Sequence, residues 1–188
     1  MKKKLTIFLI FLILSSKTIG SETSTKSNII NIIKEIETLK FSFTQISLDK
    51  KENGICFLKR PHFLKCIYED KKQKELIVNR KNLVIYHKRY DKIYFYPISK
   101  SYFVKILNKK EFENLILDGD LDFNELFFEI KYSAENKGQI TFFFEKDNFN
   151  LSGWKITDLS GSETSFKINN IKKNQHLDTQ LFNIPQIN

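Results

Sequence analysis

The 188-residue chain is poor in the residues that mark catalytic and redox motifs. It contains six glycines, two cysteines and three histidines. No stretch reads GxSxG, CxxC or HExxH, and no glycine-rich phosphate loop is present. These absences exclude a nucleophile elbow, a thioredoxin-type dithiol and a zinc-protease helix. We expect no enzyme activity, no catalytic residue and no cofactor, with an envelope hydrolase as the enzyme-class alternative.

A calcium loop is also incomplete. Asp118, Asp120 and Asp122 alternate, and Glu129 falls at the twelfth position counted from Asp118. The sixth position is Phe123, where the sharp turn of such a loop requires glycine. We interpret the segment as a solvated loop that caps the next element, and we expect no metal site.

Long apolar runs are absent except near the N-terminus. Three lysines at positions 2–4 precede Leu5–Leu14, which is apolar apart from Thr6. This run is too short to span a membrane, which takes about 20 residues. Small residues follow it, as in a secretory signal peptide. We expect residues 1–20 to be a signal peptide cleaved near Gly20-Ser21, without a lipid anchor, and residues 21–188 to form one domain in the periplasm.

The basic charge is spread along the chain. The net charge is +9, but four of the 31 basic residues and none of the 22 acidic ones lie in residues 1–20. The remaining excess is scattered, which is typical of a solvated surface. Together with export, this argues against a nucleic-acid partner, although several tyrosines lie among the basic residues.

Aromatic residues are abundant, with 18 phenylalanines among them. Each aromatic side chain can bury roughly 150–250 Å². Phe127-Phe128 and Phe142-Phe143-Phe144 are runs within β-rich segments. Consecutive residues of a strand point to opposite faces, so both faces must meet apolar groups. Either a central strand is packed on both sides, or one face lines a ligand cavity.

Apolar periodicity predicts one helix followed by many short strands. Ile29, Ile32, Ile33, Ile36 and Leu39 form a helical stripe over Asn28–Leu39, capped by residues 25–27. Residues 99–122 have helical spacing in two short pieces, and Leu181-Phe182 could add a last strand. Turn-like separators about ten residues apart favour an antiparallel meander in a single α+β domain. The ten expected strands are Phe41–Leu48, Gly54–Leu58, Phe63–Tyr68, Glu75–Val78, Leu83–His87, Lys92–Tyr96, Leu126–Tyr132, Gln139–Glu145, Leu151–Thr157 and Thr164–Asn170.

The two cysteines flank a turn. Cys56 and Cys66 lie five positions from Pro61 on either side, so they would face each other in a hairpin centred on that residue. Export makes a disulfide chemically possible. Two buried free thiols are the alternative.

Three stretches, in order, resemble the outer-membrane lipoprotein carrier family, the LolA-type periplasmic chaperones. They are Ser42-Phe43-Thr44-Gln45, Gly54–Pro61 and Trp154–Gly161, and Leu83–Tyr86 fits an apolar-aromatic strand between them. The chain departs from the family after Pro61. His62 replaces a small turn residue, and Phe63-Leu64 with Cys66 replaces a Phe and Trp pattern.

The resemblance implies an open antiparallel half-barrel of ten or eleven strands, with helices as a lid over an apolar concave face. It implies a monomeric carrier that takes acylated lipoproteins from an inner-membrane ABC transporter to an outer-membrane acceptor. A lipid- or glycolipid-binding or envelope-stress-sensing module on the same fold is the alternative. In the family, the arginine at the position of Arg60 is thought to hold the lid closed. The other expected ligand or lid residues are Phe43, Phe57, Phe63, Leu64, Tyr86, Phe103 and Ile106.

Overall fold

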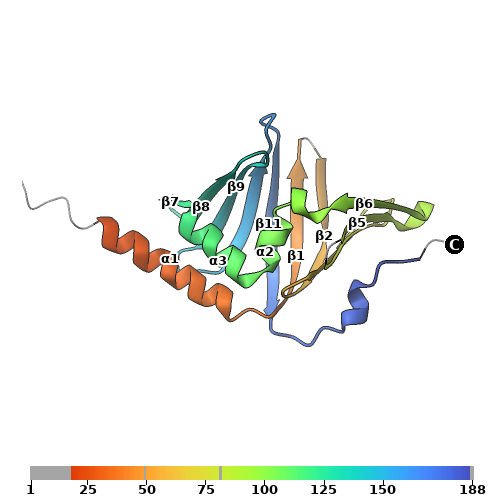
Figure 1. Cartoon of the computed structure of the whole chain (residues 1–188), viewed down its shortest axis with the longest axis horizontal. Helices are drawn as coiled ribbons and strands as arrows, with labels where there is room; N and C mark the ends of the chain where they lie inside the picture. The colour runs from red at the N-terminus through yellow and green to blue at the C-terminus, as the bar shows by residue number, and fades with distance from the viewer. Residues whose placement is uncertain (1–17, 49, 81, 187–188) are drawn as a thin grey trace, which may run out of the picture.

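The structure, a computed structural model, describes residues 18–48, 50–80 and 82–186. Over these residues it contains one eleven-stranded antiparallel sheet that does not close into a barrel, in the order β6-β5-β4-β3-β2-β1-β11-β10-β9-β8-β7 (Figure 1). This confirms the predicted fold class. The strands are β1 (Thr38–Ser47), β2 (Lys50–Lys59), β3 (Phe63–Tyr68), β4 (Lys74–Asn79), β5 (Asn82–His87), β6 (Lys92–Pro97), β7 (Asp120–Phe123), β8 (Phe127–Ala134), β9 (Gly138–Glu145), β10 (Leu151–Thr157) and β11 (Glu163–Lys173).

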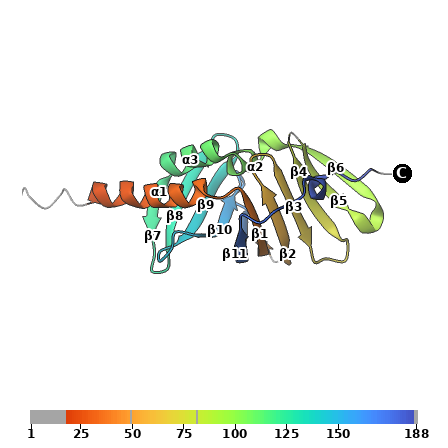
Figure 2. The same cartoon turned by 90° about the horizontal axis from the view of Figure 1, so that it is seen from below.

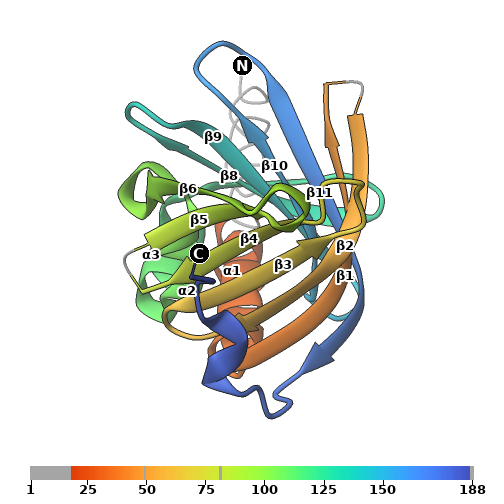
Figure 3. The same cartoon turned by 90° about the vertical axis from the view of Figure 1, so that its right-hand side faces the viewer.

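Three α-helices lie on the concave face of the curved sheet (Figures 2 and 3). They are α1 (Thr18–Lys34), α2 (Phe103–Leu107) and α3 (Lys109–Asp118). The two inserted helices agree with the helical spacing predicted between residues 99 and 122. Short 3₁₀ turns η1 (Lys88–Tyr90), η2 (Ile98–Lys100) and η3 (Thr179–Phe182) complete the described elements. No helix among the described residues is long and apolar enough to span a membrane.

The predicted limits of the first helix were wrong. The helix already includes Thr18 and ends at Lys34, and Leu39 belongs to β1. Thr25 is not a cap, because its hydroxyl donates to the carbonyl of Ser21 one turn earlier, at 2.9 Å. Ile36 and Leu39 are both buried beyond the helix end, so apolar spacing alone does not mark where the helix stops. Residues 1–17 of the expected signal peptide lie outside the described residues, and the expected cleavage near Gly20-Ser21 stays a prediction.

Two further elements differ from the expectation. Asp120–Phe123, expected as a solvated loop, forms strand β7 and pairs with β8. The segment around Leu181-Phe182, expected as a strand, is instead η3, whose first turn is capped by Asp178 accepting from the Gln180 N–H. In both places the segment is too short for apolar alternation to distinguish a strand from a turn.

The main apolar core lies between the helices and the concave face. Alternate residues of each strand point to this face, among them Phe41, Leu58, Leu64 and Phe142, all at most 5% exposed. A smaller apolar cluster lies on the opposite, outer face. There Ile77, Val84 and Phe182 are fully buried, and the ring of Phe182 packs against Phe63. The C-terminal segment therefore covers the outer face of β3 and β4.

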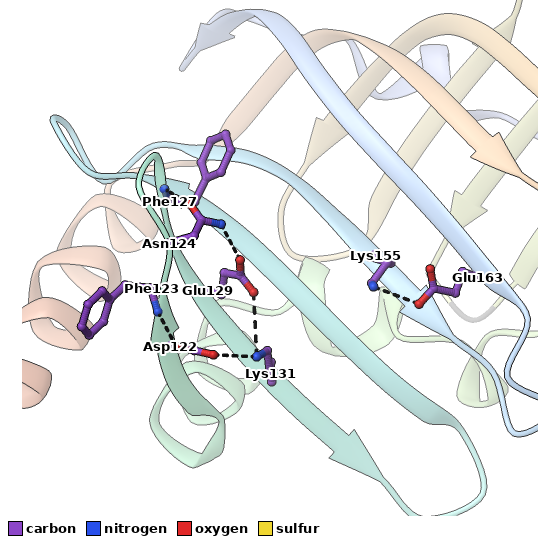
Figure 4. A network of polar contacts seen from close by, with 8 residues as sticks. All are labelled: Asp122, Phe123, Asn124, Phe127, Glu129, Lys131, Lys155 and Glu163. Atoms are coloured by element: carbon purple, nitrogen blue, oxygen red, sulfur yellow. Dashed lines mark hydrogen bonds and ion pairs between the residues drawn. The ribbon is translucent and has the colours of Figure 1, made fainter.

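The outer face of the other half of the sheet carries ion pairs and hydrogen bonds (Figure 4), together with the partly buried rings of Phe127 and Phe143, whose centroids lie 6.1 Å apart. Lys131 of β8 pairs with Asp122 of β7 at 2.8 Å, and Asn124 donates to Glu129 at 2.6 Å. The hydrogen bond from Lys131 lowers the pKa of Asp122. Lys155 and Glu163 form a similar pair across β10 and β11, at 2.9 Å. The ion pairs lie on a solvent-exposed part of this face, whereas the larger apolar core lies on the concave face.

Candidate functional site

An apolar cavity lies between the three helices and the concave face. Its volume in this structure is about 60 Å³, far below the roughly 300–1,000 Å³ of typical ligand pockets. The cavity is therefore small, and a bulky ligand could enter it only if the helices moved away from the sheet. Its lining residues are Ile32, Ile33, Ile36, Leu39, Phe41, Cys56, Leu58, Arg60, Leu64, Cys66, Phe103, Ile106, Leu107, Phe112, Phe144, Phe149, Leu151, Trp154 and Ile168.

Strand register explains the floor of this cavity. Phe41 pairs with Cys56, and Cys56 pairs with Cys66, so these residues share one face. Leu58 and Leu64 occupy the next inward positions of the same hairpin. Cys56 and Cys66 are joined by a disulfide with an S–S distance of 2.04 Å, and this bond crosslinks the two strands beside the Arg60-Pro61 turn.

Polar contacts join the helices at one end of the cavity. Asn108 caps α3 by accepting from the Glu111 N–H at 3.1 Å. Lys109, in the first turn of α3, donates to the carbonyl of Lys34 at the end of α1, at 2.7 Å, and also pairs with Glu37. A cation near the C-terminal carbonyls of a helix is favourable. The Glu37 side chain is 68% exposed, so this connection is solvent-accessible and can break at modest free-energy cost.

The concave face becomes polar beyond the cavity. Phe43 is 2% exposed and packs edge-on against Tyr68, with ring centroids 5.0 Å apart. The Tyr68 hydroxyl donates to Gln45 at 2.8 Å, and Glu52 accepts from Lys74 at 2.9 Å. Burial raises the pKa of Tyr68, with further contributions from Glu52 and Asp70. The aromatic pair Phe43–Tyr68 thus separates the apolar cavity from a hydrogen-bonded polar end.

Among the described residues that line the cavity, Arg60 is the one with a charge. It is 9% exposed, and its guanidinium lies over the ring of Phe112 of α3, 5.6 Å from the ring centroid. Burial lowers the pKa of Arg60 to about 10, while the charge of Glu37 opposes this shift. Its backbone N–H donates to the carbonyl of Glu37 at 2.9 Å, which fixes the turn against the residue that directly precedes β1.

The structure brings some of the expected site residues together and separates others. Arg60, Leu64, Phe103 and Ile106 line the cavity, and Phe43 lies on the same face, next to it. Phe57, Phe63 and Tyr86 point to the outer face, because each is one register position from an inward residue. Phe57 lies under the Lys40 ammonium, Phe63 packs against Phe182, and Tyr86 donates to Asp91. These three are not part of the cavity.

The sequence-based list missed much of the wall. Ile32 and Ile33 of α1 and Ile36, just beyond the helix end, face the cavity, and their apolar stripe was visible in the sequence. Phe112 and Trp154 also line the cavity. The position of Phe144 could also be predicted from the sequence, because Phe142 and Phe144 must share the face of the strand opposite to Phe143.

Comparisons with known proteins agree with this geometry. The family model described as "Outer membrane lipoprotein carrier protein LolA" matches residues 34–185, which confirms the resemblance. Three solved structures share the fold: an uncharacterised conserved protein from Thermus thermophilus (TM-score 0.55, 7% identity, covering 87% of this chain and 94% of that one), a DUF1329 family protein from Desulfovibrio piger (0.51, 8%, 86% and 96%), and the Pseudomonas aeruginosa MucA/MucB complex (0.51, 7%, 88% and 61%). A search of curated proteins finds no match.

Proposed function

Since the chain belongs to the outer membrane lipoprotein carrier protein LolA family, we propose that it is a carrier that binds the acyl chains of lipoproteins and moves them from the inner to the outer membrane. The observation that carries this proposal is the apolar cavity between the three helices and the concave sheet. Eighteen of its nineteen lining residues are hydrophobic or disulfide-bonded cysteines.

The energetics of such a site favour transfer rather than permanent retention. An acyl chain gains about 0.8 kcal/mol for each buried CH₂ group, so a long chain would bind too tightly to leave a preformed site. A cavity of about 60 Å³ requires the helices to open. The free energy of opening is subtracted from the affinity, and the ligand then remains transferable. The exposed Lys109–Glu37 contact is one interaction that opening would break.

The proposed cellular setting follows from the family match and the N-terminal sequence. We expect a periplasmic monomer that receives lipoprotein from an inner-membrane ABC transporter and delivers it to an outer-membrane acceptor. The signal-peptide pattern of residues 1–20 supports export. The MucB fold also occurs in a complex with another protein, so a sensor on the same fold is the competing possibility.

The test is lipoprotein release from inner-membrane vesicles that carry loaded transporter. Leu64→Trp fills the cavity from β3, whereas Ile67→Trp places the same ring on the outer face of the same strand, where Ile67 is 39% exposed. We expect wild type and Ile67→Trp to release lipoprotein in a soluble complex, and Leu64→Trp to release at least tenfold less. Equal release by both variants would refute cavity binding. Mass spectrometry of the bound ligand identifies a carrier if it finds acylated peptide and a lipid-binding module if it finds free lipid alone.

A further inference from the structure

Arg60 has a property that a lid latch does not explain. Its Nε and Nη1 atoms are both buried, and neither has a hydrogen-bond partner among the described residues. Nor does any described carboxylate form an ion pair with it. We propose that Arg60 is the polar anchor of the cavity and binds the two-oxygen end of an acyl chain, a carboxylate or an ester. This inference rests on the proposed function and names which part of the ligand the protein recognises.

The first argument is the free-energy cost of the unpaired cation. A buried guanidinium loses its hydration, and a protein normally compensates with a carboxylate or with several carbonyl oxygens. Here the cavity supplies apolar side chains instead, and the face of the Phe112 ring provides a partial substitute. With this arrangement, most of the hydrogen bonds that would replace the lost hydration of the guanidinium must come from a ligand that enters the cavity.

The second argument is that Glu37, the acid whose charge acts on Arg60, already forms an ion pair with Lys109. The charge of Glu37 acts on Arg60, but the Glu37 carboxylate pairs with Lys109 and is largely in solvent. Lys109 therefore holds the acid at the surface and away from the buried donors of Arg60. In a latch, the helices would supply carbonyl acceptors to the arginine. The helices already lie on the sheet in this structure, yet Nε and Nη1 remain unpaired.

The third argument is the geometry of the turn. Arg60 lies at the end of the β2–β3 hairpin, four residues beyond Cys56, so the disulfide holds the strands from which it projects. The cavity lining continues from there across β2, β1, β11 and β10 to Phe144 of β9. At about 4.8 Å between neighbouring strands, this path suits an elongated ligand with its oxygen-bearing end at Arg60 and its hydrocarbon toward Trp154.

Arginine suits this end group chemically. Its planar fork donates two parallel hydrogen bonds to a carboxylate, and its N–H groups also bind ester carbonyls. An alcohol at the end of the same chain offers a single oxygen and no charge. We therefore expect the affinity of the protein for a ligand to depend on the end group of the ligand as well as on its chain length.

The test uses three probes with the same dansyl-labelled undecyl chain, which end in a carboxylic acid, a methyl ester or an alcohol. Binding is followed by dansyl fluorescence with wild type, Arg60→Met, Arg60→Lys and Arg89→Met, the last being an exposed arginine outside the cavity. We expect wild type and Arg89→Met to bind the acid about tenfold or more tightly than the alcohol. Arg60→Met should bind acid and alcohol equally, and Arg60→Lys should fall between. Preference for the ester as well as the acid identifies an esterified chain as a ligand, and preference for the acid alone identifies a free fatty acid.

A second measurement separates the anchor from a structural role. Replacing an unpaired buried cation by the apolar methionine should leave the urea midpoint of the ligand-free protein unchanged or raise it. Equal binding of all three probes by wild type, or discrimination that survives in Arg60→Met, would overturn the anchor while leaving the carrier proposal standing. If wild type binds none of the probes, the carrier proposal itself fails.

Discussion

The ring of Phe182 packs against the ring of Phe63 with their centroids 5.4 Å apart, on the face of the sheet that points away from the cavity. Phe182 is fully buried, and the Asn79 side chain donates to its carbonyl at 2.9 Å. The Lys59 ammonium holds the same segment by donating to the carbonyl of Leu177 at 2.8 Å. The C-terminal segment thus packs on the outer face through the buried ring of Phe182, and a few hydrogen bonds stabilise it there.

Phe182→Ala should therefore lower stability without altering the cavity. Removing a fully buried phenylalanine ring typically lowers the free energy of unfolding by about 3–5 kcal/mol. Urea unfolding followed by circular dichroism measures the loss. Leu159→Ala is the matched control, because Leu159 is 73% exposed, and it should change the free energy by less than about 0.5 kcal/mol. Fatty-acid binding by folded Phe182→Ala should equal that of wild type, and a loss of binding would contradict the separation of the two faces.

The Cys56–Cys66 bond should contribute measurable stability. It closes a loop with a sequence separation of ten residues, and the chain-entropy relation gives about 3 kcal/mol for such a loop. We expect the free energy of unfolding of the double variant Cys56→Ala/Cys66→Ala to be lower by about that amount. Its urea midpoint should fall accordingly. Dithiothreitol should shift the wild-type midpoint in the same direction and leave the double variant unchanged. An unshifted wild-type midpoint under complete reduction would show that the loop is held by other contacts.

Tyr68 predicts a loss of stability at alkaline pH. Its folded-state pKa is raised above its ordinary value near 10, first by burial and then by Glu52 and Asp70. Above pH 10 the unfolded chain releases this proton while the folded protein retains it, so the stabilisation present below pH 10 declines as pH rises. Urea midpoints at pH 8–11 should fall more steeply for wild type than for Tyr68→Phe. Parallel slopes would contradict the burial of this hydroxyl.

Lys109→Ala should loosen the closed state. The variant removes the contacts of α3 with the Lys34 carbonyl and the Glu37 carboxylate. We expect faster association of a dansyl fatty acid in stopped-flow fluorescence, by a few-fold, because helix opening limits entry. Lys110→Ala is the control, since Lys110 contacts Glu113 within the same helix. Identical association rates for wild type and both variants would show that breaking the Lys109 contacts does not limit the entry of the ligand.

Much of the sheet could be predicted from local patterns. Ten strands were expected near their observed positions, because turn residues and apolar alternation recur about every ten residues. Strand β7 was missed, since its four residues include two acids and one inward-pointing Leu121. Asp122 pairs with Lys131 of the neighbouring strand, and pairing across strands is not visible in a local pattern.

The side of the sheet that each aromatic residue faces was harder to predict. Phe57 and Phe63 look like core residues, but an outer cluster exists because the C-terminal segment returns to cover β3 and β4. The C-terminal segment and the strands that it covers are more than 100 residues apart in the sequence, so no local sequence pattern predicts their contact. Arg60, by contrast, was found through the resemblance, and only the three-dimensional arrangement shows that its donors are unpaired.

The first and last strands of the described fold, β1 and β11, are neighbours at the centre of the sheet, with Phe43 opposite Ile168. Each half of the sheet is a series of hairpins that can form locally, but the seam between them joins segments over 100 positions apart. Closing so long a loop slows folding. A chain still being synthesised therefore cannot complete its central strand pair until β11 has emerged.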